Sequence, residues 1–163
     1  MISLNEPNIN KKDIQSVVKT LKDNWVSSSG PEVSKLENKI CKFTSAKNAV
    51  AFVNATSALF MALKLIGANR NTEIIVPTVT FVAPVNAILY NSASPIFMDV
   101  DKYFNIDVDK TIEFLNKQTI FKNGYTINKK TGRKILAIIV VHVWGNAVFL
   151  DNIKKICKKK ISN

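Results

Sequence analysis

The chain has 163 residues, 47% of them hydrophobic, and is long enough to bury a core as one domain of ordinary size. It carries 23 basic and 12 acidic residues, a net charge of +11, but Arg70 and Arg133 are the only arginines. Because nucleic-acid readout favours arginine, and no run of about 18 apolar residues occurs, we expect neither a nucleic-acid partner nor a membrane-spanning helix.

The first part of the chain predicts two helices joined by a loop. Residues 11–23 and residues 31–43 both place apolar side chains three and four positions apart, which is the period of an amphipathic helix. Pro31 stands at the start of the second helix, where proline is favoured because the first N–H groups of a helix have no partner. The loop between the helices reads Trp25-Val-Ser-Ser-Ser-Gly-Pro31.

Beyond residue 48, short apolar runs alternate with helical patterns. The expected strands lie at residues 49–53, 73–77, 95–99 and 135–141. The expected helices lie at residues 55–67, 81–91, 107–117 and 151–161, with Gly67 near the end of the first and Asp107 capping the third. Strands that are apolar throughout are typical of a mostly parallel sheet with helices on both faces, so we expect an α/β fold.

One polar stretch interrupts this alternation. Residues 119–134 contain the turn signals Asn123-Gly124 and Thr131-Gly132. We therefore expect a hairpin-like insertion before the last strand.

Four segments should meet at the carboxyl ends of the expected strands, where parallel sheets bind ligands. They are Asn54–Ser57, Pro77–Phe81, Asp99–Asp101 and His142–Asn146. In the first of them, small residues open a helix, and Thr56 and Ser57 add two hydroxyl groups. The unpaired N–H groups and the positive dipole end of a helix suit a phosphate. An ordinary helix cap with small residues is the alternative.

Five blocks of the sequence follow one another in an order found in one enzyme family. They read WVSSSGPEVSKLE, FVNATSALFMALKLIG, EIIVPTVTFVAPVNAILY, ASPIFMDVD and VHVWGNAVFLDNI. The chain thereby resembles the DegT/DnrJ/EryC1/StrS family of pyridoxal-phosphate (PLP) aminotransferases, which act on nucleotide-linked keto-sugars. The segment YTINKKTGRKILAIIVVHVWG is most similar to the branch that makes legionaminic-acid or bacillosamine-type amino sugars.

The resemblance implies the aspartate aminotransferase-like fold, fold type I. Residues 1–30 would form an N-terminal arm, helix and loop, and residues 31–163 the first part of the large PLP-binding domain. Family members are more than twice this length, and their pyridinium-binding acid and Schiff-base lysine correspond to positions beyond this sequence. We therefore name no catalytic residue and expect the chain alone to be inactive.

Within the chain, the resemblance assigns four residues to the cofactor. Ala55, Thr56 and Ser57 would hold the PLP phosphate, and Phe81 would stack on the pyridine ring. The family's turn usually has glycine where Ala55 stands, which bears on how closely a ligand approaches the backbone. The alternative for Phe81 is a core position, since the chain has nine phenylalanines.

The resemblance places four further residues near the substrate. Ser29 and Gly30 would border the sugar-nucleotide pocket, Asn86 would point into the cleft, and His142, the single histidine, would lie at the ligand edge. The alternatives are a connecting loop, a helix-surface amide and a structural histidine.

Three other polar residues are given structural roles. We read Asp99 and Asp101 as loop and cap residues rather than metal ligands, and the family uses no metal. Lys64 lies in an apolar helix, two turns beyond the expected phosphate turn, and we expect its amine to extend to solvent rather than replace the Schiff-base lysine.

The sequence thus predicts the N-terminal part of an enzyme that transfers an amino group from glutamate to a UDP-linked 4-keto-6-deoxy sugar in surface-polysaccharide or nonulosonate biosynthesis. PLP is the implied cofactor, and full-length family members are usually homodimers. One alternative is a non-catalytic α/β module that binds a nucleotide sugar or phosphate, and another is a basic protein whose lysine-rich helix, residues 154–160, binds acidic partners. Cysteines 41 and 157 in helical patterns, and a first segment without a secretory signal, indicate a cytoplasmic protein.

Overall fold

The computed structural model describes residues 6–161, so the segment used to judge a secretory signal lies mostly outside the described residues. The chain divides into two compact units, and the boundary falls between Ala51 and Phe52. The division expected after residue 30 concerns the larger domain of the family and stays a prediction.

The first unit contains two helices, α1 (Lys11–Lys22) and α2 (Pro31–Thr44). Asn10 caps α1, because its side chain accepts from backbone N–H groups of the first turn while Asp13 accepts from the Asn10 N–H. Pro31 opens α2 as predicted. Neither helix buries a residue, so the described part of this unit has no core of its own.

The expected strand at residues 49–53 is wrong. The segment forms no strand, and Val53 is 88% exposed. The Ala51 N–H donates to Oε1 of Glu37 at 2.9 Å instead of to a neighbouring strand. A strand needs a partner for its ladder of backbone hydrogen bonds, and no described residue pairs with this apolar run.

The second unit is built on a five-stranded sheet with the order β2-β1-β5-β4-β3. The strands are β1 (Thr72–Pro77), β2 (Ser94–Met98), β3 (Thr119–Lys122), β4 (Tyr125–Asn128) and β5 (Lys134–Ile138). β1 pairs in parallel with both β2 and β5, whereas β4 pairs antiparallel with β3 and β5. The α/β prediction is confirmed, but β5 is shorter than the expected 135–141.

The polar stretch before β5 forms a hairpin of β3 and β4. Asn123 and Gly124 both have positive φ angles, 53° and 79°, as a tight two-residue hairpin turn requires. β4 meets β5 at two residue pairs, Thr126 with Ile135 and Ile127 with Lys134. The hairpin therefore lies beside the beginning of β5.

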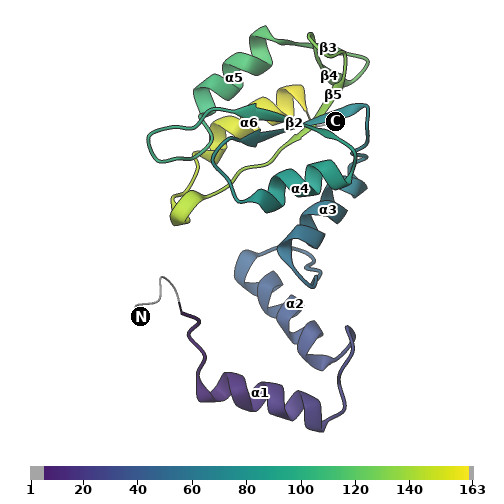
Figure 1. The fold of residues 1–163 in the computed structure, drawn as a ribbon, viewed down its shortest axis with the longest axis vertical. Helices are drawn as coiled ribbons and strands as arrows, with labels where there is room; N and C mark the ends of the chain where they lie inside the picture. The colour runs from purple at the N-terminus through teal and green to yellow at the C-terminus, as the bar shows by residue number, and fades with distance from the viewer. Residues whose placement is uncertain (1–5, 162–163) are drawn as a thin grey trace. The chain divides into compact units, whose positions relative to one another are not determined.

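Two pairs of helices cover the faces of the sheet (Figure 1). On one face, α3 (Ala55–Leu65) and α4 (Val82–Tyr90) pack on Ile74 and Val76. On the other face, α5 (Val108–Lys117) and α6 (Leu150–Lys160) enclose Ile75. Asp107 caps α5 as predicted, since its Oδ1 accepts from the Lys110 N–H at 2.9 Å.

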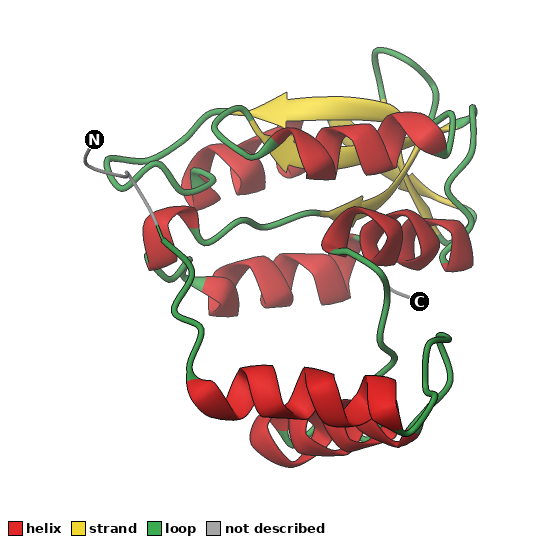
Figure 2. Cartoon of the chain, turned by 60° about the horizontal axis from the view of Figure 1, so that its bottom comes forward, coloured by secondary structure: helices red, strands yellow, loops and turns green. Residues whose placement is uncertain are grey.

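All strands belong to the second unit, and the first consists of helices and loops (Figure 2). Cys41 lies in α2 and Cys157 in α6, and neither forms a disulfide with another described residue. Among residues 6–161, no helix combines the length and the apolar character that a membrane span needs.

Candidate functional site

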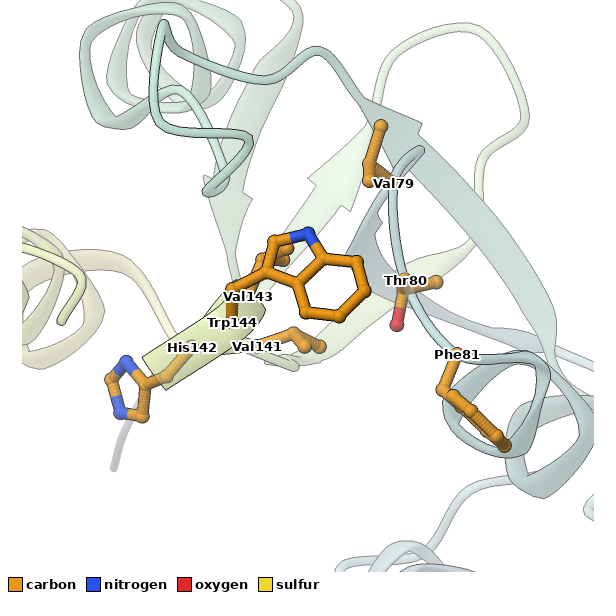
Figure 3. A pocket seen from close by; sticks show the side chains of 7 residues that line it. All are labelled: Val79, Thr80, Phe81, Val141, His142, Val143 and Trp144. Carbon is orange, nitrogen blue, oxygen red and sulfur yellow. The ribbon is translucent and has the colours of Figure 1, made fainter. Parts of the chain in front are cut away.

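A pocket of about 350 Å³ opens at the carboxyl ends of β1 and β5. Its lining comes from two loops, one after each strand (Figure 3). The lining residues are Val79, Thr80, Phe81, Val141, His142, Val143 and Trp144. Two of the four segments expected at this edge are therefore brought together, although their residues lie about 60 positions apart in the sequence.

Phe81 stands directly before α4, at its N-cap position. Its backbone is extended, with φ −63° and ψ 152°, and its phenyl ring is 79% exposed. A core position for this ring is excluded by that exposure. Pro84, in the first turn of α4, is buried and does not interrupt the helix.

Thr80 contributes an unsatisfied hydroxyl to the same pocket. Its Oγ1 atom is buried and has no hydrogen-bond partner among the described residues, a condition shared with Oδ1 of Asn91. Figure 3 shows this oxygen pointing into the space between the rings of Phe81 and Trp144. A buried hydroxyl without a partner is unfavourable, so this atom is suited to a polar group of a ligand. The sequence analysis did not single out Thr80.

Trp144 was also missed from the sequence. It lies in the 3-10 turn η1 (Val143–Gly145) with φ 54° and ψ 25°, and its indole is 91% exposed. A bulky residue with positive φ is an uncommon backbone state that requires support from its surroundings. The signal in the sequence that could have indicated this turn was a Trp-Gly pair soon after an apolar run.

Asn105 supplies that support from the loop between β2 and α5. Its side-chain Oδ1 accepts from the Val143 N–H at 3.1 Å, and its Nδ2 donates to the Asn146 carbonyl at 3.2 Å. The residue is only 2% exposed. One buried amide thus holds both ends of the turn that carries Trp144.

His142 lines the pocket but is engaged elsewhere. Its Nδ1 accepts from the Val148 N–H at 3.1 Å, which places the proton of the neutral ring on Nε2. Figure 3 shows the imidazole pointing away from Trp144 and Phe81. The ring therefore fixes the loop that leads to α6.

The predicted phosphate turn opens α3. Asn54 caps the helix, with its Oδ1 accepting from the Ser57 N–H at 2.9 Å. The hydroxyls of Thr56 and Ser57 make no hydrogen bond with any described residue and line a second pocket, with Phe60 and Tyr90. Ala55 has a negative φ angle, so its methyl group strains no backbone there. This turn and Phe81 line separate pockets.

The other predicted substrate residues do not line the pocket at Phe81. Ser29 and Gly30 belong to the first unit, where Gly30 lies beneath Trp25: a Cβ on the glycine would be 3.3 Å from the indole. Asn86 is half-buried on α4 and lines neither pocket.

Asp99 and Asp101 have protein partners. Asp99 is hydrogen-bonded to Lys110, which lowers the pKa of the carboxyl group, and Asp101 Oδ1 accepts from the N–H groups of Tyr103 and Asn105. Within residues 6–161, no three His, Cys, Asp or Glu side chains gather as a metal ion would require.

Comparison with known proteins supplies the family. The sequence model of the DegT/DnrJ/EryC1/StrS aminotransferase family matches residues 7–161. The chain belongs to this family. Among curated relatives, GDP-perosamine synthase of Escherichia coli O157:H7 is 31% identical over 159 residues, which are 98% of this chain and 40% of the relative. The spore coat polysaccharide biosynthesis protein SpsC of Bacillus subtilis is 34% identical over 148 residues, 90% of this chain and 34% of the relative.

Solved structures of aminotransferases share the fold. The putative sugar aminotransferase Spr1654 of Streptococcus pneumoniae, in its PMP form, has a TM-score of 0.81 and 26% identity, over 97% of this chain and 36% of the neighbour. PseC of Helicobacter pylori is an aminotransferase involved in the biosynthesis of pseudoaminic acid. It has a TM-score of 0.76 and 29% identity, over 96% of this chain and 38% of the neighbour. The chain therefore spans well under half the length of the proteins it matches, as expected from the sequence.

Proposed function

We propose that this chain is the N-terminal part of a PLP-dependent aminotransferase that passes an amino group from glutamate to a nucleotide-linked 4-keto-6-deoxy sugar. The observation that carries the proposal is the pocket where the exposed ring of Phe81 and the unpartnered hydroxyl of Thr80 meet. Family membership supports the reaction class, since the curated relatives include sugar aminotransferases.

The lining of the pocket fits a flat aromatic cofactor. Phe81 offers one face of a ring, and the binding of planar ligands gains from the dispersion and burial that such a face provides. The Thr80 hydroxyl, which has no partner among the described residues, would form a hydrogen bond with a polar substituent of the cofactor. At about 350 Å³, the pocket has the size of a site for one small ring compound.

The first turn of α3 is the proposed phosphate site. The N–H groups of Ala55 and Thr56 and the hydroxyls of Thr56 and Ser57 have no protein partner in the described part of the chain. Four donors at the positive end of a helix would bind the ester group of the cofactor. Asn54 stabilises this turn through its cap on the Ser57 N–H.

When bound, PLP supplies the electron sink that amino transfer needs. The residues present here would orient the ring and hold the phosphate, and none of them is placed to move the substrate proton. Lys64 is exposed in the last turn of α3, about 12 Å along the helix from Thr56, and does not replace a lysine at the ring. We therefore propose that residues 1–163 alone have no transaminase turnover.

The finer substrate assignment rests on the resemblance. The sugar would carry UDP, as in the legionaminic-acid or bacillosamine branch, and Ser29, Gly30, Asn86 and His142 would lie on the substrate side. The complete enzyme would act as a cytoplasmic homodimer in surface-polysaccharide or nonulosonate biosynthesis.

Calorimetric titration of the chain with pyridoxamine 5′-phosphate tests the cofactor site. This form carries an amine rather than an aldehyde, so it cannot condense with the many surface lysines. We expect saturable binding that is lost in Thr56→Val/Ser57→Ala and kept in Ser34→Ala, which removes an exposed hydroxyl from α2. Pyridoxamine without phosphate should bind far more weakly.

Two outcomes would overturn the proposal. Binding of a UDP-sugar without any binding of pyridoxamine 5′-phosphate would favour the non-catalytic module. Transfer of the amino group from glutamate to a UDP-4-keto-6-deoxy sugar by the 163-residue chain would refute its inactivity.

A further inference from the structure

Trp144 combines two unfavourable features, a left-handed backbone and an exposed side chain. Its backbone adopts the left-handed conformation, which is unfavourable for a residue other than glycine. The residue is 91% exposed, so burial of the ring does not compensate for the backbone strain. Strained residues that persist are held by their surroundings, and they concentrate where a ligand is bound.

The surroundings that hold Trp144 are specific. Asn105 is buried, and its own N–H donates to Oδ1 of Asp101 at 3.0 Å, which fixes the amide in place. The side chain then spans the turn, accepting from Val143 and donating to Asn146. These contacts join segments separated by about 40 residues of sequence, so the turn is built by the tertiary fold.

The turn presents the indole to the pocket that contains Phe81. Figure 3 shows the two rings on either side of Thr80, with the hydroxyl oxygen between them. Two exposed aromatic rings and one unsatisfied polar atom in a pocket of about 350 Å³ form a site for a planar ring with a polar substituent.

We propose that Trp144 is a second ring-contacting residue of the site and that Asn105 is the positioning residue that holds it there. This inference rests on the proposed function, because the planar ligand is the pyridine ring assigned above to Phe81. Phe81 and Trp144 then contact the same ring from the ends of two different strands.

The test uses the complete 163-residue chain and pyridoxamine 5′-phosphate. Trp25 and Trp144 are the two tryptophans, so Trp25→Phe leaves Trp144 as the sole reporter. We expect its fluorescence to be quenched saturably, with a midpoint equal to the calorimetric Kd. Trp144→Phe should weaken binding about 3- to 10-fold, the range expected when one well-placed aromatic contact is reduced. Phe149→Leu, which removes an exposed ring outside the pocket, should leave the Kd unchanged.

A double-mutant cycle tests the positioning role of Asn105. Asn105→Ala should weaken binding in the wild-type background and lower the fluorescence anisotropy of Trp144 in the Trp25→Phe background. Asn105→Asp keeps the acceptor for Val143 and loses the donor to Asn146, so its effect should be intermediate. In the Trp144→Phe background, Asn105→Ala should add little, because the amide acts through the indole.

The outcomes separate the two proposals. If the wild-type chain binds pyridoxamine 5′-phosphate and Trp144→Phe binds it equally well, the role of Trp144 is refuted while the cofactor site stands. If Asn105→Ala weakens binding equally in both backgrounds, Asn105 does not act through Trp144. If the wild-type chain shows no saturable binding, both the proposed function and this inference fail.

Discussion

Nδ2 of Asn128 donates a hydrogen bond to Oε2 of Glu73 at 2.8 Å, between two buried side chains. Glu73 lies in β1 and Asn128 ends β4, so the bond joins the parallel strands to the hairpin. We expect Asn128→Ala to lower the free energy of unfolding by about 1–3 kcal/mol, because it leaves a buried carboxylate oxygen without its donor. Glu73→Gln keeps an acceptor and should cost much less. Urea unfolding of both variants checks this, and equal losses would contradict it.

Thr80→Val should have opposite effects on the free and ligand-bound chain. Without ligand, the change removes a buried hydroxyl that has no partner and should leave the stability unchanged or raise it by up to about 1 kcal/mol. Binding of pyridoxamine 5′-phosphate should weaken. Thermal unfolding with and without the ligand measures both effects, with Thr78→Val at a neighbouring exposed position as the control. A loss of stability without ligand would show that Thr80 has a structural partner.

The Asp107 side chain that caps α5 should contribute to the free energy of unfolding as much as helix caps usually do. Asp107→Ala removes the acceptor for the Lys110 N–H and should lower the free energy of unfolding by about 1 kcal/mol. Asp109→Ala, in the same first turn but without a capping bond, should cost less. Denaturant titration compares the two, and an equal effect would argue for charge rather than capping.

The pKa of Asp99 should depend on one lysine. The hydrogen bond from Lys110 lowers the pKa of the carboxyl group, and the bond to Asp99 raises the pKa of the Lys110 amine. The carboxylate therefore stabilises the fold above its unfolded pKa, and the contribution is lost as the pH falls through the lowered pKa, below about pH 4. The lysine contribution is complete below its unfolded pKa and is lost as the pH rises through the raised pKa, above about pH 10.

Carboxyl NMR titration measures this dependence. Lys110→Gln should raise the pKa of Asp99 and leave that of Glu113 unchanged. The matched variant Lys117→Gln should do the reverse, because Lys117 is the partner of Glu113. An unchanged pKa of Asp99 in Lys110→Gln would show that the pair does not persist in solution.

The two units should differ in their ability to fold alone. Residues 1–51 bury no helical side chain, and helices of about 12 to 15 residues are marginal in water without packing. Residues 52–163 hold two clusters of buried apolar residues around β1. Circular dichroism of the separate segments should show little helix in the first and a cooperative unfolding transition in the second. A stable helical signal from residues 1–51 would contradict this.

The regular elements of the second unit could be predicted because their pattern is local. The runs at β1 and β2 are apolar and bounded by turn residues, and the Asn123-Gly124 pair placed the hairpin. The run at 49–53 has the same character but forms no strand, since pairing depends on a neighbour that the run itself does not specify. The last strand was predicted to reach residue 141, but β5 ends at Ile138, and beyond it the Ile139 N–H still donates to the Ile75 carbonyl of β1 at 2.8 Å.

The pocket was only partly predictable. The segments Pro77–Phe81 and His142–Asn146 were predicted because they follow apolar runs that end at one edge of the sheet, and the family resemblance singled out Phe81 and His142 within them. Thr80 and Trp144 were missed, because an unsatisfied hydroxyl and a left-handed backbone are properties of the folded chain. Asn105 carries no local signal at all, since both segments that its side chain joins are distant in sequence.

The shortness of the contact between β4 and β5 has a consequence for growth of the sheet. Only Lys134 and Ile135 of β5 pair with the hairpin, so Ala137 and Ile138 pair with β1 alone within the described chain. On that side the edge of β5 has no strand partner among the described residues, and its side chains from Leu136 to Ile138 are half-buried. Because the hairpin occupies only Lys134 and Ile135, a segment that paired with this edge would have to begin at residue 136 or later.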